Sequence, residues 1–201
     1  MTAVKAITLA TKITLFRIFM VPVFIALALY YGESVKKGQP EELFRWAAII
    51  VFVLAAASDA LDGYIARRFN QRSRLGSFLD PIADKALMLA AILTLSFTNW
   101  GQYLPLWYAA LVVGRDIVQV AGAALIGHIA GDIEVIPHWT GKFATFLQIL
   151  VIGWVFFNLT KPPVQAVAAV AAIFTIYSAA LYIRDGLRQL PDHHDDQSHH
   201  S

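Results

Sequence analysis

The sequence contains no cysteine and few charged residues. The absence of cysteine excludes disulfide bonds, thiolate metal sites and cysteine nucleophiles. Charged residues make up only 15% of the 201 residues, whereas 58% are hydrophobic, and the mean hydropathy is +0.58. Such a chain is too apolar for an ordinary soluble domain. We therefore expect an integral membrane protein.

Six apolar stretches are long enough, or nearly so, to cross a hydrocarbon core of about 30 Å as helices. The polar segments between them are too short to form separate domains. We expect an all-α integral membrane protein with one domain over residues 1–190, a short interfacial helix within residues 1–12, and a disordered His- and Asp-rich tail over residues 191–201. The predicted spans are residues 13–31, 43–66, 78–97, 104–129, 139–158 and 164–183.

The distribution of lysine and arginine predicts the orientation. With six spans, both termini share one side with the second and fourth connections, and that side carries 12 of the 16 Lys and Arg residues. The positive-inside rule makes it the cytoplasmic side. Four tryptophans near predicted span ends are typical of an aromatic belt at the membrane surface: Trp100, Trp107, Trp139 and Trp154.

Four aspartates interrupt this apolar sequence in the pattern D-x-x-D-G-x-x-A-R-x8-G-x3-D-x3-D. A carboxylate at bilayer depth costs about 2.5–3.5 kcal/mol. Asp59 and Asp62 share one face of a helix, and Asp80 and Asp84 share a face of the next. The short connection makes the two helices antiparallel neighbours, so the acidic faces meet. Capping and salt bridges to nearby cations are the structural alternative.

Converging carboxylates repel one another unless a cation lies among them. Oxygen ligands suit Mg²⁺, Mn²⁺ or Ca²⁺ rather than zinc or copper. Two such ions can clamp a phosphate, activating the attacking oxygen and stabilising the leaving one. Gly63 and Ala66 leave room for a ligand near the backbone, and Arg67 is placed to neutralise a second phosphate. The pattern therefore indicates phosphoryl chemistry.

The stretch SDALDGYIARRFNQRSRLGSFLDPIADK, residues 58–85, resembles the signature of the CDP-alcohol phosphatidyltransferases, with every fixed position filled. Weaker similarity covers nearly the whole chain. It includes a T-x-x-R at Thr14 and Arg17 and a G-K-x-x-T at Gly141, Lys142 and Thr145.

The resemblance implies an enzyme with two Mg²⁺ or Mn²⁺ ions that transfers the phosphatidyl group of CDP-diacylglycerol to an alcohol and releases CMP. It implies a homodimer in the bacterial inner membrane, with its active site facing the cytoplasm and no nucleic-acid partner. Asp84 is also implied as the general base, since a base must reach the acceptor proton. The implied metal ligands are Asp59, Asp62, Asp80 and Asp84, and the implied contacts to the cytidine diphosphate are Gly63, Ala66, Arg67 and Gly76.

The segments T-K-I-T-L-F-R and L-D-P-I-A-D-K resemble the phosphatidylglycerophosphate synthase and cardiolipin synthase branch of this family. An anionic acceptor requires cations, and Arg115 and Lys142 are the candidates. Each also has a structural interpretation, as an ion pair with Asp116 and as an interfacial snorkelling lysine. We expect glycerol-3-phosphate as the acceptor, with phosphatidylglycerol as the alternative.

The chain departs from the family pattern at two places, of which the first concerns the start of the first helix and the second the acceptor. Ala10-Thr11 replaces the usual Pro-Asn, and Gly114-Arg115-Asp116 replaces an A-R-E that a second arginine follows. The Arg-Asp pair resembles eukaryotic-type cardiolipin synthases. A different class, a proton or divalent-cation transporter, would also place carboxylates in a membrane. Transporters usually carry repeats or broken helices near the midplane, whereas these acids cluster at one boundary.

Overall fold

The structure, a computed structural model, is built from α-helices. It describes the backbone of residues 9–69, 74–130 and 139–187, and the side chains of residues 13–58, 83, 85–122 and 139–186. All regular secondary structure in these ranges is helical, which confirms the all-α prediction for them. The helices are α1 (Leu9–Lys36), α2 (Glu42–Phe69), α3 (Arg74–Phe97), α4 (Leu106–Ala130), α5 (Trp139–Phe156) and α6 (Val164–Leu187).

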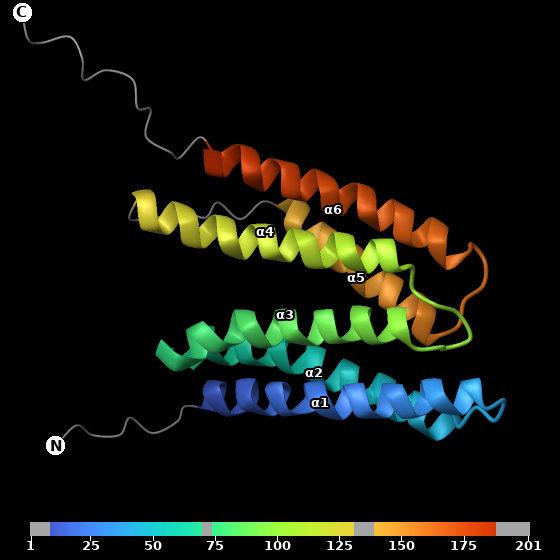
Figure 1. The fold of residues 1–201 in the computed structure, drawn as a ribbon. Helices are drawn as coiled ribbons and strands as arrows, with labels where there is room; N and C mark the ends of the chain where they lie inside the picture. Colours follow the sequence, from blue (N-terminus) through green and yellow to red (C-terminus); the bar gives the residue numbers. More distant parts are fainter. Residues whose placement is uncertain (1–8, 70–73, 131–138, 188–201) are drawn as a thin grey trace, which may run out of the picture.

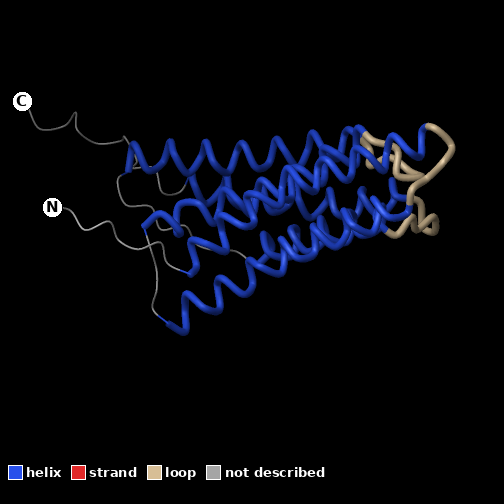
Figure 2. The backbone as a smooth tube through the Cα atoms, turned by 90° about the horizontal axis from the view of Figure 1, so that it is seen from below, coloured by secondary structure: helices blue, strands red, loops and turns tan. Residues whose placement is uncertain are grey.

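The helices run alternately up and down in one elongated bundle (Figure 1). Helix α3 is central and contacts α1, α2, α4 and α5, so it joins an α1–α3 half to an α4–α6 half. The start of α1, the end of α2, the start of α3 and the end of α6 lie at one end, which we call the motif end. The loops of the opposite end, called the aromatic end, are drawn in tan in Figure 2.

The outside of the bundle is apolar. Phe19, Ile50 and Ile173 are 65%, 55% and 66% exposed. The helices contain 18 to 28 residues, or about 27 to 42 Å at 1.5 Å per residue, which matches the thickness of a bilayer. Three described segments have the length and composition of a membrane span: Ile13–Lys36, Trp139–Phe156 and Val164–Gly186. These features are those of a membrane protein.

Local sequence signals explain several helix ends. Helices α4 and α6 begin directly after Pro105 and Pro163, whose carbonyls accept hydrogen bonds from the first turns, because proline is pre-organised for a helix start. Helix α5 ends before Asn158, which has a φ of 52°, the left-handed conformation common after a helix C-terminus. At the chain start, residues 9–12 belong to α1 itself. The prediction of a separate interfacial helix is therefore wrong for residues 9–12. Residues 1–8 lie outside the described part of the chain.

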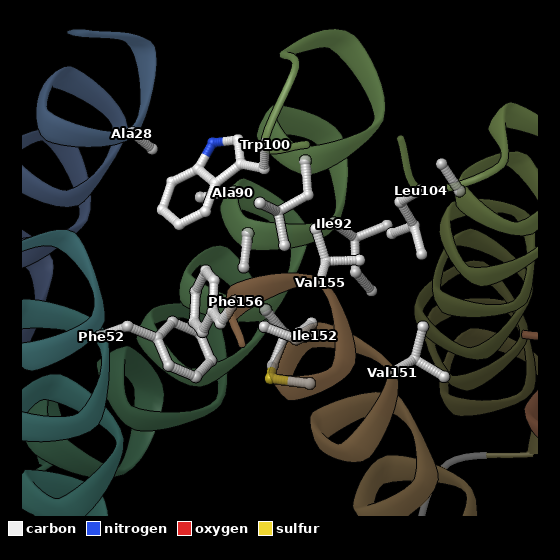
Figure 3. Packing of buried hydrophobic residues seen from close by; sticks show 14 of the residues in the cluster. Ala28, Phe52, Ala90, Ile92, Trp100, Leu104, Val151, Ile152, Val155 and Phe156 are labelled. Atoms are coloured by element: carbon white, nitrogen blue, oxygen red, sulfur yellow. The ribbon is translucent and has the colours of Figure 1, made fainter. Parts of the chain in front are cut away.

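Buried aromatic rings fill the core of the aromatic end. Figure 3 shows Phe52, Trp100 and Phe156 close together. Phe156 lies 5.3 Å, between ring centroids, from both Phe52 and Trp100, and Tyr31 lies 4.7 Å from Trp100. Trp100 is only 1% exposed, so the aromatic-belt prediction is wrong for this residue. Hydropathy places a tryptophan near a helix end but does not say whether the ring points outward or inward.

Hydrogen bonds between distant segments close the same end. Arg45 Nε donates to the Phe156 carbonyl at 3.0 Å, which satisfies a carbonyl at the end of α5. Gln102 Nε2 donates to the carbonyls of Trp154 and Leu159, both at 3.2 Å. These bonds join α2 and the α3–α4 connection to the end of α5, so the two halves of the bundle are locked together here.

Candidate active site

The aspartate motif lies on two neighbouring helices near the motif end. Asp59 is ten residues before the end of α2 at Phe69, and Asp84 is ten residues after the start of α3 at Arg74. Both positions are therefore about 15 Å from the connected ends of their helices. Because α2 and α3 run antiparallel and contact each other, the two positions lie at the same level. The predicted antiparallel pairing is confirmed.

The other two aspartates lie at a second, nearby level. Asp62 is seven residues before Phe69, and Asp80 is six residues after Arg74. All four positions thus fall within a slab about 6 Å thick along the bundle axis. The side chains of the predicted motif residues lie outside the described part, so their roles stay predictions: Asp59, Asp62, Gly63, Ala66, Arg67, Gly76, Asp80 and Asp84.

Buried polar side chains lie beside this slab, beginning with Arg17 on α1. Arg17 is 0% exposed, and its Nε donates to Ser58 Oγ on α2 at 3.4 Å. Ser58 in turn donates to the Ala55 carbonyl at 2.7 Å. Since Ser58 directly precedes Asp59, this contact places a buried guanidinium at the level of the first motif acid. The T-x-x-R arginine is therefore part of the site region.

A second polar contact joins α3 to α4. Asp116 Oδ1 lies 3.6 Å from Lys85 Nζ and 3.2 Å from Arg115 Nη1. The side chains of Arg115 and Asp116 are only 9% and 13% exposed. Lys85 directly follows Asp84, so this contact lies at the level of the last motif acid. The ion pair that we considered as a structural interpretation of Arg115 is present, and it includes a lysine from the motif helix.

On its other side, Arg115 approaches α5 and α6. A Cβ atom added to Gly141 would lie 3.8 Å from Arg115 Nη2 and 3.6 Å from Ser178 Oγ. Arg115 Nε and Thr140 Oγ1 are buried and lack a hydrogen-bond partner in the described structure. Buried polar atoms are nearly always hydrogen-bonded, so these two atoms have hydrogen-bonding capacity that a ligand could use.

We call this set of buried or half-buried residues the polar layer. Gly141, the glycine of the G-K-x-x-T segment, lies next to the polar layer. Lys142 is exposed and forms no ion pair with a described side chain, a position that suits a snorkelling lysine. The structure thus brings Arg115 and Gly141 together but leaves Lys142 at the edge. The polar layer consists of Arg17, Ser58, Lys85, Arg115, Asp116, Thr140 and Ser178.

Sequence reasoning gave Thr140 and Ser178 no role. Their only signal is that each is a polar residue in an apolar helix, and such a residue usually bonds to its own backbone. Thr175, three residues before Ser178, does this by donating to the Ala171 carbonyl at 2.8 Å. The sequence pattern alone therefore does not distinguish a hydroxyl residue near the site, such as Thr140, from one that bonds to its own helix, such as Thr175.

Comparisons with known proteins show the family to which the chain belongs. The family described as CDP-alcohol phosphatidyltransferase matches residues 7–178. A protein of Escherichia coli K12 named CDP-diacylglycerol–glycerol-3-phosphate 3-phosphatidyltransferase is 32% identical over 190 residues, which cover 90% of this chain and 96% of the relative. Proteins of the same name from Shigella flexneri serotype 5b and Shigella sonnei match equally well. The helical fold, the motif and these matches define the protein as a membrane transferase. The chain belongs to the CDP-alcohol phosphatidyltransferase family.

The donor set of the motif fits divalent metal ions. Four carboxylates on two adjacent helices supply only oxygen ligands, the type that Mg²⁺ and Mn²⁺ prefer. Among the side chains that the structure describes, no group of three or more His, Asp or Glu residues forms another candidate site.

Proposed function

We propose that the protein transfers the phosphatidyl group of CDP-diacylglycerol to glycerol-3-phosphate, forming phosphatidylglycerophosphate and CMP. One observation carries this proposal: an unbroken donor motif in a chain that aligns with 96% of a relative named for the same reaction. The proposal is also supported by the position of the motif on α2 and α3, which is level with the buried cations Arg17 and Arg115.

In this proposal the donor binds at the aspartate slab. Asp59, Asp62, Asp80 and Asp84 hold two Mg²⁺ or Mn²⁺ ions, which when bound neutralise charge on the diphosphate. Gly63, Ala66 and Gly76 allow the cytidine diphosphate close to the backbone, and Arg67 pairs with a phosphate oxygen. The acyl chains of the donor stay in the bilayer, alongside the apolar outer surface of the bundle.

The acceptor hydroxyl then attacks the phosphorus that carries the diacylglycerol. Asp84 accepts the hydroxyl proton as general base. The new oxygen–phosphorus bond forms as the bond from that phosphorus to the bridging oxygen breaks, and CMP leaves with the bond's electron pair. The protein contributes position and compensating charge rather than covalent chemistry.

The acceptor binds between α4 and α5. Arg115 Nε and Thr140 Oγ1 are buried groups with unused hydrogen-bonding capacity, and both suit the oxygens of a phosphate. Lys142, one residue beyond Gly141, adds a cation at the edge.

The proposal includes a topology. A single domain over residues 1–190 crosses the bacterial inner membrane six times as a homodimer, with both termini and the motif end in the cytoplasm. The cysteine-free chain allows a clean test with an impermeant maleimide. Ser73→Cys should react in inverted but not in right-side-out vesicles, and Gln39→Cys should show the opposite. The reverse pattern would contradict the orientation.

The activity is tested by CMP release. Purified protein, Mg²⁺ or Mn²⁺ and CDP-diacylglycerol are mixed with each acceptor in turn. Glycerol-3-phosphate should give the fastest release and a lipid product with two phosphates. Faster release with phosphatidylglycerol would identify a cardiolipin synthase instead. No CMP from folded, metal-binding protein with any acceptor would overturn the enzyme proposal.

A further inference from the structure

Lys85–Asp116 differs from the other ion pairs of the molecule. Where both side chains are described, the remaining pairs each lie within one helix or its adjoining turn, as Glu42 and Arg45 do at 3.1 Å. Lys85 and Asp116, by contrast, join α3 to α4 at 3.6 Å. The pair therefore connects the half of the bundle that carries the motif to the half that carries the proposed acceptor groups.

One carboxylate oxygen serves two cations in this arrangement. Asp116 Oδ1 lies within 3.6 Å of Lys85 Nζ and within 3.2 Å of Arg115 Nη1. Without the carboxylate, the ammonium and the guanidinium would repel each other in surroundings of reduced dielectric constant. Asp116 thus keeps two like charges from different helices side by side.

A phosphate monoester needs this second cation. It carries up to two negative charges near neutral pH, and Arg115 is the only lysine or arginine in α4. Lys142 is exposed, whereas Lys85 already shares an oxygen atom with Arg115. Lys85 also follows Asp84 directly, so its backbone lies at the level of the proposed base.

We propose that Asp116 is a positioning residue for the acceptor: it holds Lys85 and Arg115 together as a two-cation clamp for the phosphate of glycerol-3-phosphate. This inference rests on the proposed function. The clamp adds Lys85 to the acceptor site and gives the Arg115–Asp116 pair a purpose beyond neutralising a charge in the membrane. The donor site keeps its own ligands and does not depend on Asp116.

The test is Asp116→Asn, which keeps the shape of the side chain and removes its charge. The KM for glycerol-3-phosphate should rise about tenfold or more, as expected when one partner of a buried charge pair is lost. The KM for CDP-diacylglycerol should stay within about twofold, and Asp116→Glu should recover most of the acceptor affinity. Lys85→Gln should raise the same KM, and the double variant should be little worse than the single ones because the two residues act together.

A merely structural role predicts a different pattern. It lowers the melting temperature and the amount of active enzyme, so kcat falls while both KM values stay unchanged. Glu42→Gln, which breaks the Arg45 pair at the aromatic end, is the matched control and should change neither KM. If Asp116→Asn does not fold, Lys85→Gln carries the test alone.

The failures are distinguishable. Wild-type protein that releases no CMP with glycerol-3-phosphate would overturn the proposed function and this inference with it. Active wild type, combined with an unchanged acceptor KM in Asp116→Asn or Lys85→Gln, would overturn the clamp alone. An acceptor KM that falls in Asp116→Asn would also overturn it, since the carboxylate would then compete with the phosphate.

Discussion

The two ends of the bundle are built from different interactions. At the aromatic end, buried rings and loop hydrogen bonds fasten α1, α2 and α5 together, with Phe156 touching Phe24, Phe52 and Trp100. At the level of the motif, the contacts between helices include charged and hydroxyl groups with unused bonding capacity, such as Arg115 Nε and Thr140 Oγ1. At the aromatic end the buried atoms that lack a hydrogen-bond partner in the described structure, Trp100 Nε1 and Tyr108 Oη, are neutral, whereas near the motif one such atom belongs to the guanidinium of Arg115.

This difference suggests a division of labour. Aromatic packing gains stability without placing charge in the membrane, so the aromatic end can hold the six helices in register. Charged side chains within a membrane cost free energy and usually mark a site of binding or catalysis. Changes at the aromatic end should therefore alter stability, and changes near the motif should alter activity.

The largest expected effect is that of Asp84→Asn. Loss of a general base usually lowers the rate by about 10²–10⁴-fold, and the amide cannot take the hydroxyl proton. The kcat for CMP release should fall by this amount, while CDP-diacylglycerol still binds in a direct titration. Glu33→Gln, an exposed partner of Lys37 at the aromatic end, is the control. Near-normal turnover in Asp84→Asn would remove this residue from the mechanism.

Phe156→Ala should give the next largest effect, in stability rather than turnover. Phe156 is 3% exposed and touches rings from three other segments, and truncation of a buried phenylalanine costs about 3–5 kcal/mol. The denaturation midpoint in detergent should drop markedly, while the KM values of the folded fraction stay unchanged. A shift in acceptor KM instead would show that the two ends are coupled.

Gly32→Ala should cost less, about 1–3 kcal/mol, through overpacking. A Cβ atom on Gly32 would lie 2.8 Å from Thr98 Cβ, so α1 and the end of α3 would have to move apart. Thermal denaturation should show a lower midpoint, with no change in either KM. An unchanged midpoint would mean that this close approach is easily relaxed.

Much of the fold could be predicted from the sequence, because apolar length sets where helices cross a membrane. Each predicted span overlaps one helix, and four of the helices, α1, α2, α3 and α6, are longer than their spans: α1 runs to Lys36 rather than residue 31. The hydrogen-bonded backbone continues past the apolar stretch, so hydropathy marks the embedded part rather than the helix. The burial of Trp100 was missed because it depends on Tyr31 and Phe156, which are far away in the sequence.

The candidate site also has one part that could be predicted from the sequence and one part that could not. The antiparallel pairing of the two motif helices follows from helix periodicity and a short connection, which are local properties, and the backbone confirms this pairing. The polar layer needs contacts between distant segments. Asp116 reaches Lys85 across 31 positions, and Gly141 lies beside Arg115 only because α4, α5 and α6 pack together. A single sequence carries no signal for such pairs beyond the presence of charge in an apolar helix.

The smallest and most selective effect is expected for Gly141→Ala, the same substitution as Gly32→Ala but near the motif. Its Cβ would make ordinary contacts, 3.6 Å from Ser178 Oγ and 3.8 Å from Arg115 Nη2, and alanine favours a helix over glycine by up to about 1 kcal/mol. Stability should therefore stay equal or rise slightly. The methyl group narrows the space beside the guanidinium, however, so the KM for glycerol-3-phosphate should rise by a factor of about 3–10, the cost of about 1 kcal/mol in a binding site. Loss of stability with an unchanged acceptor KM would show that the space beside Arg115 is packing room rather than part of the acceptor site, and the contrast between the two ends would then fail at this position.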